Sequence, residues 1–413
     1  MLPDNFGKRG QYAGAAIWGS SPPIDIARNL IYIATGNLYS TPQNITDCQE
    51  RQNNQTQVPP THSDECVEPD NHSDSFLALD LDTGNIKWFH QLGGYDVWFF
   101  VCNNLSVPDC PPGPNPDADF GEAPMMLSID VNGTKKDIVV AVQKSGFAWA
   151  LDRDNGNIIW STEAGPGGIA GGGTWGAATD EMRVYTNIVN SEGKTFTLKP
   201  STRNTTAGGW VTMDAKTGQI LWSIGDPSNG TANGPVTVAN GVLFGGSTYK
   251  EGPIYAMDAK SGKILWSYNT GATVFGGMSV SDGCIFIGHG YREWLSHGGN
   301  ILNRRFADKE NKISPETVSK LRLKWKFDAG RDITATPSVS DGAVYFPSWD
   351  GYLYAVKESD GSLIWKQNLQ QLTGINSTGV IFNVNVTASR TTPAVLPMIC
   401  SSLGSVDRLL LSQ

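Results

Sequence analysis

Residues 77–88 read LALDLDTGNIKW, and this stretch decides the fold because the chain repeats it. Further copies, with small departures, are WALDRDNGNIIW at 149–160, VTMDAKTGQILW at 211–222, YAMDAKSGKILW at 255–266 and YAVKESDGSLIW at 354–365. Each copy predicts a β-hairpin in which the Asp side chain fixes its own turn and the Gly takes a positive φ. The Trp returns at the same place each time, where it can pack against a neighbouring unit.

Two more short strands precede most copies, with sequences such as NLIYIAT, DIVVAVQ, GVLFGGS and AVYFPSW. The repeating unit is therefore a four-stranded sheet of about 40–50 residues. Such a sheet cannot bury both faces alone, so the units must stack around an axis. The sequence predicts an all-β fold, a β-propeller in which about six blades can be counted.

The composition agrees with many strands and tight turns. The 413 residues include 47 Gly and 13 Trp, only 17% are charged, and the net charge is −9. Low charge excludes a coiled coil, and 39% hydrophobic residues exclude wholesale disorder. No apolar run approaches the roughly 18 residues of a membrane span, and no basic run suits a nucleic-acid backbone. Dinucleotide, Walker and serine-hydrolase motifs are missing as well.

Cysteines and glycosylation motifs favour a secreted or cell-wall protein. Cys48 with Cys66, and Cys102 with Cys110, each bracket a short polar loop, as a disulfide would. Reduced cytosolic thiols are the alternative. Asn-x-Ser/Thr triplets, several of them in the same loops, start at Asn44, Asn54, Asn71, Asn104, Asn132, Asn204, Asn229, Asn376 and Asn385. The first 12 residues show no signal peptide, so the chain is either cytosolic or lacks its true beginning.

The repeat resembles the tryptophan-docking motif of the eight-bladed quinoprotein alcohol dehydrogenases, which use pyrroloquinoline quinone (PQQ) and a bound divalent cation. The nearest likeness is to the branch of polyvinyl-alcohol-dehydrogenase-like proteins, and it extends to about residue 395. In that family a segment like Trp294-Leu-Ser-His-Gly-Gly and Ser314-Pro-Glu-Thr-Val opens the chain, whereas here it lies far inside. Residues 1–290 resemble the family's second half, 291–330 its start and ring-closing strand, and 331–413 its first blade with a truncated next one.

Two explanations fit this order of blades. One is a circular permutation, which a propeller tolerates because its first and last strands are neighbours. The other, which we favour, is a gene prediction that joins the tail of one tandem copy to the head of the next. By either explanation the propeller is permuted or incomplete.

The resemblance also implies a cofactor site. Trp18 matches the platform on which the quinone stacks, although it could be another packing Trp. Asn37, in Thr35-Gly36-Asn37, matches the amide ligand of the cation, with an ordinary turn Asn as the alternative. Lys144 matches the cation that contacts the quinone oxygens; a solvated Lys at a strand end is the alternative.

Two acidic residues complete the expected site. Asp117 matches the catalytic base, and Asp119 is the second acid; in an extended strand both would face one cation. Asp96 is the runner-up base, and an Asp-rich polar loop is the alternative for the pair. Thr174 and Trp175 lie in a turn that lines the channel in the family, where Asn often precedes the Trp.

The resemblance implies an oxidoreductase that oxidises a primary or secondary alcohol, with hydride transfer to PQQ and a Ca²⁺-like divalent or trivalent cation. Because the chain has no haem-attachment motif, electrons would pass to an external acceptor. A cofactor-free propeller that acts as a binding or scaffold module is the rival hypothesis, since fold does not fix function. A non-functional fragment of a tandem gene is the third.

Overall fold

The fold is given by a computed structural model that describes residues 11–19, 21–52, 66, 68–99, 102, 110–111, 115–289, 304–375, 387–389, 392–396 and 408–410. The chain forms two compact units. Unit 1 holds residues 1–232 and 300–305, and unit 2 holds residues 233–299 and 306–413. The domain bounds expected from the sequence stay a prediction.

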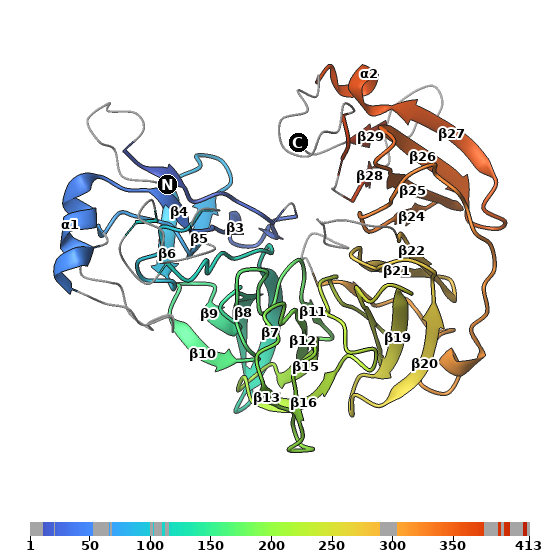
Figure 1. The fold of residues 1–413 in the computed structure, drawn as a ribbon, viewed down its shortest axis with the longest axis horizontal. Helices are drawn as coiled ribbons and strands as arrows, with labels where there is room; N and C mark the ends of the chain where they lie inside the picture. Colours follow the sequence, from blue (N-terminus) through green and yellow to red (C-terminus); the bar gives the residue numbers. More distant parts are fainter. Residues whose placement is uncertain are drawn as a thin grey trace. The chain divides into compact units, whose positions relative to one another are not determined.

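Unit 1 contains three four-stranded antiparallel sheets (Figure 1). The first pairs β2 Ile24–Asp25, β3 Leu30–Ala34, β5 Ser75–Asp80 and β6 Ile86–Gln91 in that order. The second is β7 Met125–Val131, β8 Thr134–Val142, β9 Phe147–Asp152 and β10 Ile158–Glu163. The third is β11 Ala178–Thr179, β12 Arg183–Ile188, β15 Gly209–Asp214 and β16 Ile220–Gly225.

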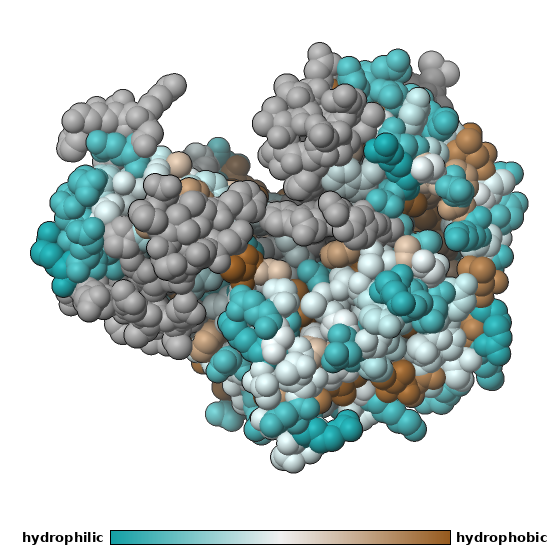
Figure 2. All heavy atoms as spheres, viewed as in Figure 1, coloured by the Kyte–Doolittle hydropathy of each residue, from teal (hydrophilic) through white to brown (hydrophobic). Residues whose placement is uncertain are grey.

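Unit 1 also contains two pairs of short strands, one helix and two disulfides. Two-stranded pairs join β1 Ala13–Gly14 to β4 Leu38–Ser40, and β13 Phe196–Thr197 to β14 Asn204–Thr205. Helix α1, Gln43–Gln52, presents a hydrophilic outer surface (Figure 2). The two expected disulfides are present, Cys48–Cys66 and Cys102–Cys110.

Unit 2 contains two complete blade sheets and, between them in sequence, a two-stranded pair. The first sheet is β17 Thr237–Ala239, β18 Val242–Gly246, β19 Pro253–Asp258 and β20 Ile264–Asn269, with β23 Phe306–Ala307 parallel to β17. The second is β24 Ser338–Ser340, β25 Ala343–Pro347, β26 Tyr352–Lys357 and β27 Leu363–Asn368. Between them in sequence lies the pair β21 Met278–Ser281 and β22 Cys284–Ile287.

The remaining elements of unit 2 are short. They are the 3₁₀ turn Val318–Lys320, helix α2 Leu369–Thr373, and the paired strands β28 Ala394–Leu396 and β29 Arg408–Leu410. No helix in the described part of the chain is long and apolar enough to cross a membrane.

The turn chemistry expected from the repeat is confirmed. In the first copy, Asp80 Oδ1 accepts hydrogen bonds from the backbone N–H groups of Asp82 and Thr83 and from Thr83 Oγ1, the last at 2.9 Å. Gly84 follows with φ +72°, which a residue with a Cβ adopts only at a cost. Asp214 and Asp258 hold their turns in the same way.

In the first two sheets, the repeat Trp docks its sheet onto the turn of the next one. Trp88 Nε1 donates to the Arg153 carbonyl at 3.0 Å, and Trp160 Nε1 donates to the Ala215 carbonyl at 2.9 Å. A Cβ added at Gly156 would lie 2.5 Å from the Trp88 ring. This turn therefore needs Gly both because a side chain would collide with the indole and because φ is positive. The docking role predicted for the repeat Trp is therefore confirmed, as is the all-β propeller type of fold.

Buried apolar side chains fill the space between successive sheets of unit 1. One cluster includes Tyr32, Phe76, Trp149 and Leu151, which come from the first two sheets. Another includes Leu127, Val140, Val184 and Met213, which come from the second and third. The turns before β5 and β9 are thereby fixed, and these turns carry the candidate site.

The glycosylation motifs differ in exposure. Asn44, Asn132, Asn204 and Asn229 are exposed, whereas Asn71 is 2% exposed and its Oδ1 accepts from Ser73 N at 3.1 Å. A glycan at Asn71 therefore does not fit the folded chain. Asn54, Asn104, Asn376, Asn385 and Cys400 lie outside the described residues.

Candidate active site

The buried amine of Lys144 is the centre of the candidate site. Its Nζ lies 3.0 and 3.1 Å from the two carboxylate oxygens of Asp117 and 2.6 Å from Asp119 Oδ2. The three side chains are 6%, 1% and 2% exposed. Lys144 lies two residues after the end of β8, and its own N–H donates to the Asp119 carbonyl at 3.0 Å. We call these three residues, all expected from the sequence, the Lys144 cluster.

The extended strand expected over Asp117 and Asp119 is wrong. Asp117 has φ +56°, in the left-handed region, and residues 115–120 form no strand. Asp96 stabilises this backbone conformation. Its carboxylate accepts hydrogen bonds from Asp117 N at 3.3 Å and from Ala118 N at 2.6 Å. Both carboxylates still reach Lys144, because the backbone turns instead of extending. Asp96, the runner-up base, is thereby a support for the loop.

Aromatic rings surround the amine. Lys144 Nζ lies 5.3 Å from the centroid of the Trp18 ring and 5.9 Å from that of Trp98, within the range of a cation–π contact. The Trp18 and Trp175 rings meet edge to face at 5.7 Å. The structure therefore brings together Trp18, Trp175 and Lys144, as the resemblance implies.

Asn37 joins the cluster through its backbone and side chain. Its N–H donates to Asp119 Oδ1 at 2.8 Å, and its Nδ2 donates to the carbonyls of Leu38 and Trp98, both at 2.7 Å. Its Oδ1 is buried and has no hydrogen-bond partner among the described residues. This amide oxygen is thus held in place with its acceptor capacity unused, as a cation ligand would be.

Thr174 is the last of the seven expected site residues, and it is fully buried. Its Oγ1 also lacks a hydrogen-bond partner among the described residues. A Cβ added at Gly171 would lie 2.5 Å from Thr174 Cγ2 and 3.2 Å from Lys144 Cγ, so the chain packs closely here. Thr174 therefore lies beside Lys144, within the same pocket of polar groups.

Asp74 is a site residue that sequence reasoning missed. Asp74 immediately precedes β5 and is 0% exposed. Neither of its carboxylate oxygens has a hydrogen-bond partner among the described residues. A Cβ added at Gly93 would lie 2.3 Å from Asp74 Cβ. Burial raises its pKa well above the usual range, and the charges of Asp96, Asp119 and Asp117 add to this effect. An Asp directly before a strand with an apolar centre was the only sign in the sequence.

The pKa values of the two carboxylates beside Lys144 are shifted in opposite directions. Burial raises the pKa of Asp117 well above its usual range, and Lys144 only partly offsets this. For Asp119, burial is outweighed by the charge and hydrogen bond of Lys144 and by Asn37 N–H, so its pKa is lowered. Burial also opposes the charge of Lys144, but the two carboxylates raise its pKa. Asp119 is therefore the ionised partner, and Asp117 is the carboxylate that can take up a proton.

A second buried pair, Glu122 and Arg305, lies next to Trp175. The Glu122 carboxylate accepts from Val142 N at 2.7 Å and Ala177 N at 2.6 Å, yet burial raises its pKa to about 7. Arg305 is 5% exposed, and a Cβ at Gly176 would lie 2.0 Å from its Nε. Burial lowers the pKa of Arg305 to about 10, and its guanidinium has no hydrogen-bond partner among the described residues. No motif in the sequence pointed to either residue.

The donor set suits a hard cation and a planar polar ring. Carboxylate and amide oxygens are the ligands that Ca²⁺ prefers, and indole faces suit a flat aromatic group. Within the described residues, no three His, Cys, Asp or Glu side chains converge as a metal-binding group. Asp117 and Asp119 are turned toward Lys144, and Asn37 Oδ1 is the oxygen left with unused capacity.

Two family models match parts of this chain. Residues 4–167 match the family described as glucose/ethanol/alcohol dehydrogenase, beta-propeller domain. Residues 207–303 match the family described as outer membrane protein assembly factor BamB.

Several dehydrogenases are similar in sequence or structure. A polyvinylalcohol dehydrogenase of Pseudomonas sp is 27% identical over 305 residues, which are 68% of this chain and 41% of that protein. That of Sphingopyxis sp. (strain 113P3) is 28% identical over 70% of this chain and 42% of its own length. The structure of a quinohemoprotein alcohol dehydrogenase from Comamonas testosteroni covers 64% of this chain and 42% of its own, at 19% identity and a TM-score of 0.45.

The chain spans about two fifths of the length of the curated relatives it matches. The matched region, residues 4–167, contains Trp18, Asn37 and the Lys144 cluster. Over residues 4–167 the chain therefore matches the β-propeller domain family of the glucose, ethanol and alcohol dehydrogenases, and over about two thirds of its length it is similar in sequence to polyvinylalcohol dehydrogenases.

Proposed function

We propose that this chain is an oxidoreductase that resembles the PQQ-dependent alcohol dehydrogenases and oxidises a primary or secondary alcohol. The observation that carries the proposal is a buried Lys144 amine bound by Asp117 and Asp119 and overlaid by the Trp18 ring. A buried cation between two acids, next to an aromatic face, is costly to fold and typical of functional sites.

The cofactor would be held by residues that the structure brings together. Trp18, Trp175, Thr174 and Lys144 would bind PQQ, and Asn37, Asp117 and Asp119 would bind a Ca²⁺-like cation. When bound, the quinone supplies the acceptor for the hydride that leaves the alcohol carbon. The unused acceptor of Asn37 and the buried Oγ1 of Thr174 support these assignments.

Asp117 is the proposed base. Its carboxylate takes the hydroxyl proton of the alcohol, while the carbon–oxygen bond becomes a carbonyl as hydride departs. Burial raises the pKa of Asp117, which makes it a stronger proton acceptor than an exposed Asp. Lys144 keeps a positive charge next to the reacting groups and stabilises negative charge that develops there.

The sequence and the disulfides also bear on the electron acceptor and on the location of the protein. Since the chain has no haem-attachment motif, the electrons would pass to a separate acceptor. The two disulfides support a secreted or extracellular location, where oxidised cysteines persist. The nature of the alcohol is left open by the side chains described.

The test is retention of quinone by the purified protein. The full chain is incubated with PQQ and Ca²⁺, desalted, and examined for quinone absorbance that elutes with the folded protein. Asp117→Asn should retain quinone but lose alcohol-dependent dye reduction by about 100-fold or more, because general bases typically contribute that much. The exposed Asp130, mutated to Asn, is the matched control and should leave the rate unchanged.

A cofactor-free binding or scaffold module is the second candidate, and the assembly-factor match over residues 207–303 favours it. The same experiment separates the two. Folded protein that retains no quinone would refute the dehydrogenase proposal and leave the scaffold. Full dye reduction by Asp117→Asn would instead move the base to another residue, and Asp96→Asn would then be the next variant to assay.

A further inference from the structure

The turn between β7 and β8 carries an exposed Asn-Gly-Thr triplet. Asn132 and Gly133 join the two strands with φ +55° and +79°, and positive φ at both central residues is typical of a type I′ hairpin turn. Asp130 fixes the turn, because its Oδ1 accepts from Gly133 N at 3.0 Å. A Cβ added at Gly133 would meet no atom within 4 Å, so the tip of the turn has room for a large group. The fold thus uses the backbone of Asn132 and exposes its side chain.

Three more Asn-x-Thr triplets of unit 1 are exposed in the same way. Asn44 lies in the first turn of α1, Asn204 in β14, and Asn229 in the loop after β16. Asn204 Oδ1 accepts from Thr197 Oγ1 at 2.9 Å, a contact that does not involve Nδ2, the atom to which a glycan is attached. The four sites thus include a helix, a hairpin turn, a strand and a loop. No shared structural demand explains why Asn is followed by Thr two residues later at each of them.

The triplet at Asn71 differs from these four. Asn71 is 2% exposed, and its third residue, Ser73, is 1% exposed. Asn71 Oδ1 accepts from Ser73 N at 3.1 Å, which is the hydrogen bond of an Asx turn. Folding therefore gives Asn71 a structural reason for its place. The motif alone does not separate Asn71 from the exposed asparagines, whereas its burial and this hydrogen bond do.

Two properties of the whole chain favour modification of the exposed triplets. Nine of its 28 asparagines head an Asn-x-Ser/Thr triplet, about twice as many as random placement of its Ser and Thr residues gives. The disulfides Cys48–Cys66 and Cys102–Cys110 are typical of the oxidising compartments of the secretory route. In eukaryotic cells, N-linked glycans are transferred to nascent chains in the first of these compartments.

We propose that Asn44, Asn132, Asn204 and Asn229 carry N-linked glycans, and that Asn71 does not. In the transfer, Asn Nδ2 forms a bond with the anomeric carbon of an oligosaccharide, while the bond from that carbon to the diphosphate of a lipid carrier breaks. The lipid diphosphate leaves with the electron pair of that bond, and the amide loses one proton. The proposal does not rest on the proposed oxidoreductase activity.

A glycan at Asn132 is compatible with an open candidate site. Strand β8 starts after the Asn132 turn and ends two residues before Lys144. Its 9 residues span about 30 Å, since a strand rises about 3.3 Å per residue. Asn132 and Lys144 therefore lie near opposite ends of the same strand, and the modified surface is separate from the Lys144 cluster.

The first test uses the protein isolated from its own organism. It is digested, treated with a peptide N-glycosidase in heavy-oxygen water and analysed by tandem mass spectrometry, because the enzyme converts each glycosylated Asn into labelled Asp. Label is expected at the four exposed asparagines and not at Asn71. The same digest without the enzyme is the control, since Asn132 and Asn229 precede Gly and therefore deamidate readily. Unlabelled Asn at the four positions would overturn the proposal, and label at Asn71 would contradict the role of burial.

Variants of the Asn132 motif separate the glycan from the turn. The full chain is secreted from eukaryotic cells behind a cleavable signal peptide, and glycans are counted from the mass lost on enzymatic deglycosylation. Thr134→Val should lose one glycan because the motif loses its hydroxyl, while Val suits the strand that pairs with Val131. Thr134→Ser keeps the hydroxyl and should keep the glycan. Thr195→Val, at an exposed Thr outside any such triplet, is the matched control and should keep every glycan.

Asn132→Gly is a second route to the same loss. Gly adopts positive φ without a Cβ, so the turn should be kept while the acceptor amide is removed. The circular dichroism of this variant should equal that of the native chain after both are deglycosylated. A glycan count that stays at the native value in Thr134→Val and in Asn132→Gly would overturn the assignment of Asn132.

Discussion

At the scale of the residue, the buried charges of unit 1 matter most. Lys144 supplies the positive charge that two buried acids need, and Asp119 makes the shorter contact with it. Asp96 and Glu122 have no such short ion pair, so burial raises the pKa of each to about 7. The candidate site therefore combines one firmly ionised pair with carboxyl groups that titrate near neutrality.

Removal of the Lys144 amine should destabilise the protein as well as inactivate it. Lys144→Met leaves Asp117 and Asp119 buried without their cation, and breaking a buried pair from one side costs about 3–5 kcal/mol. Urea unfolding should show this loss in the free energy of unfolding. Lys144→Met combined with Asp117→Asn should recover part of it, because one uncompensated charge is then removed. Equal stability of the single variant and the native chain would contradict the buried pair.

Glu122 should make unit 1 more stable as the pH falls from 7 toward 5. Its folded pKa is about 7, above the ordinary value, so the folded state binds the proton more tightly than the unfolded state. The penalty for its buried charge is fully present above pH 7 and disappears as the pH falls toward the ordinary Glu range. Its upper bound is about 3–4 kcal/mol, from roughly 1.4 kcal/mol for each pKa unit.

Chemical denaturation of the native chain and Glu122→Gln across pH 5–8 measures this effect. The native chain should lose stability with rising pH, and the variant should lose clearly less. Parallel slopes in the two proteins would assign the pH dependence to other groups, of which Asp96 is the next to mutate.

At the scale of the element, the hairpin turn held by its Asp repeats with the same contacts in both units. The repeat Gly serves two purposes that can be separated. Gly84 has φ +72° with no atom within 4 Å of an added Cβ, whereas Gly156 has φ +74° and faces the Trp88 ring at 2.5 Å. Backbone conformation is matched between the two positions, and only the docking contact differs.

Gly84→Ala should lower the free energy of unfolding by about 1–2 kcal/mol, the cost of the left-handed conformation alone. Gly156→Ala should add about 1–3 kcal/mol, because the new methyl group collides with the docked indole. Thermal unfolding of the two variants compares them directly. Equal losses would mean that the Trp ring moves aside without cost, and docking would then contribute little.

The hairpins were predictable because their determinants are local. Asp80, Thr83 and Gly84 lie within five residues, so the turn can be read from the sequence, and so can the Trp that follows it. The left-handed Asp117 was not predictable, because Asp96, far away in the chain, holds it in place. Asp74 and Arg305 were missed for the same reason: their burial is set by packing between distant segments.

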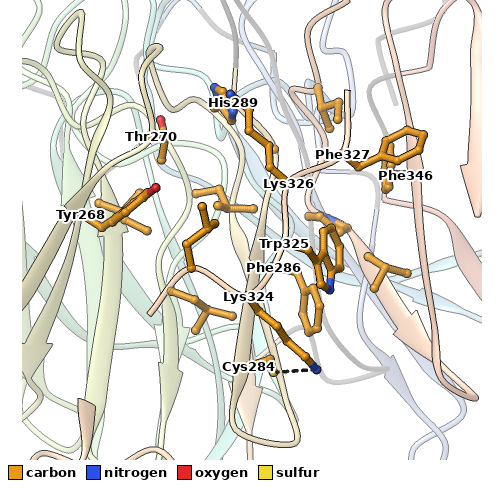
Figure 3. A pocket seen from close by; sticks show the side chains of 18 of the residues that line it. Tyr268, Thr270, Cys284, Phe286, His289, Lys324, Trp325, Lys326, Phe327 and Phe346 are labelled. Atoms are coloured by element: carbon orange, nitrogen blue, oxygen red, sulfur yellow. Dashed lines mark hydrogen bonds between the residues drawn. The ribbon is translucent and has the colours of Figure 1, made fainter. Parts of the chain in front are cut away.

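At the scale of the whole molecule, the candidate site belongs to one of the two units. Trp18, Asn37 and the Lys144 cluster lie in unit 1, whereas a cavity of about 520 Å³ lined by Phe286 and Trp325 lies in unit 2 (Figure 3). A ligand of the candidate site should therefore stabilise unit 1.

Hydrogen exchange should show this division. PQQ with Ca²⁺ at about 100 times its Kd adds about 2.7 kcal/mol of stability to the part that binds it, so protection should rise in unit 1 peptides. The strands of unit 2 should keep the exchange rates that they have without PQQ. Protection spread evenly over both units would show that the units unfold together.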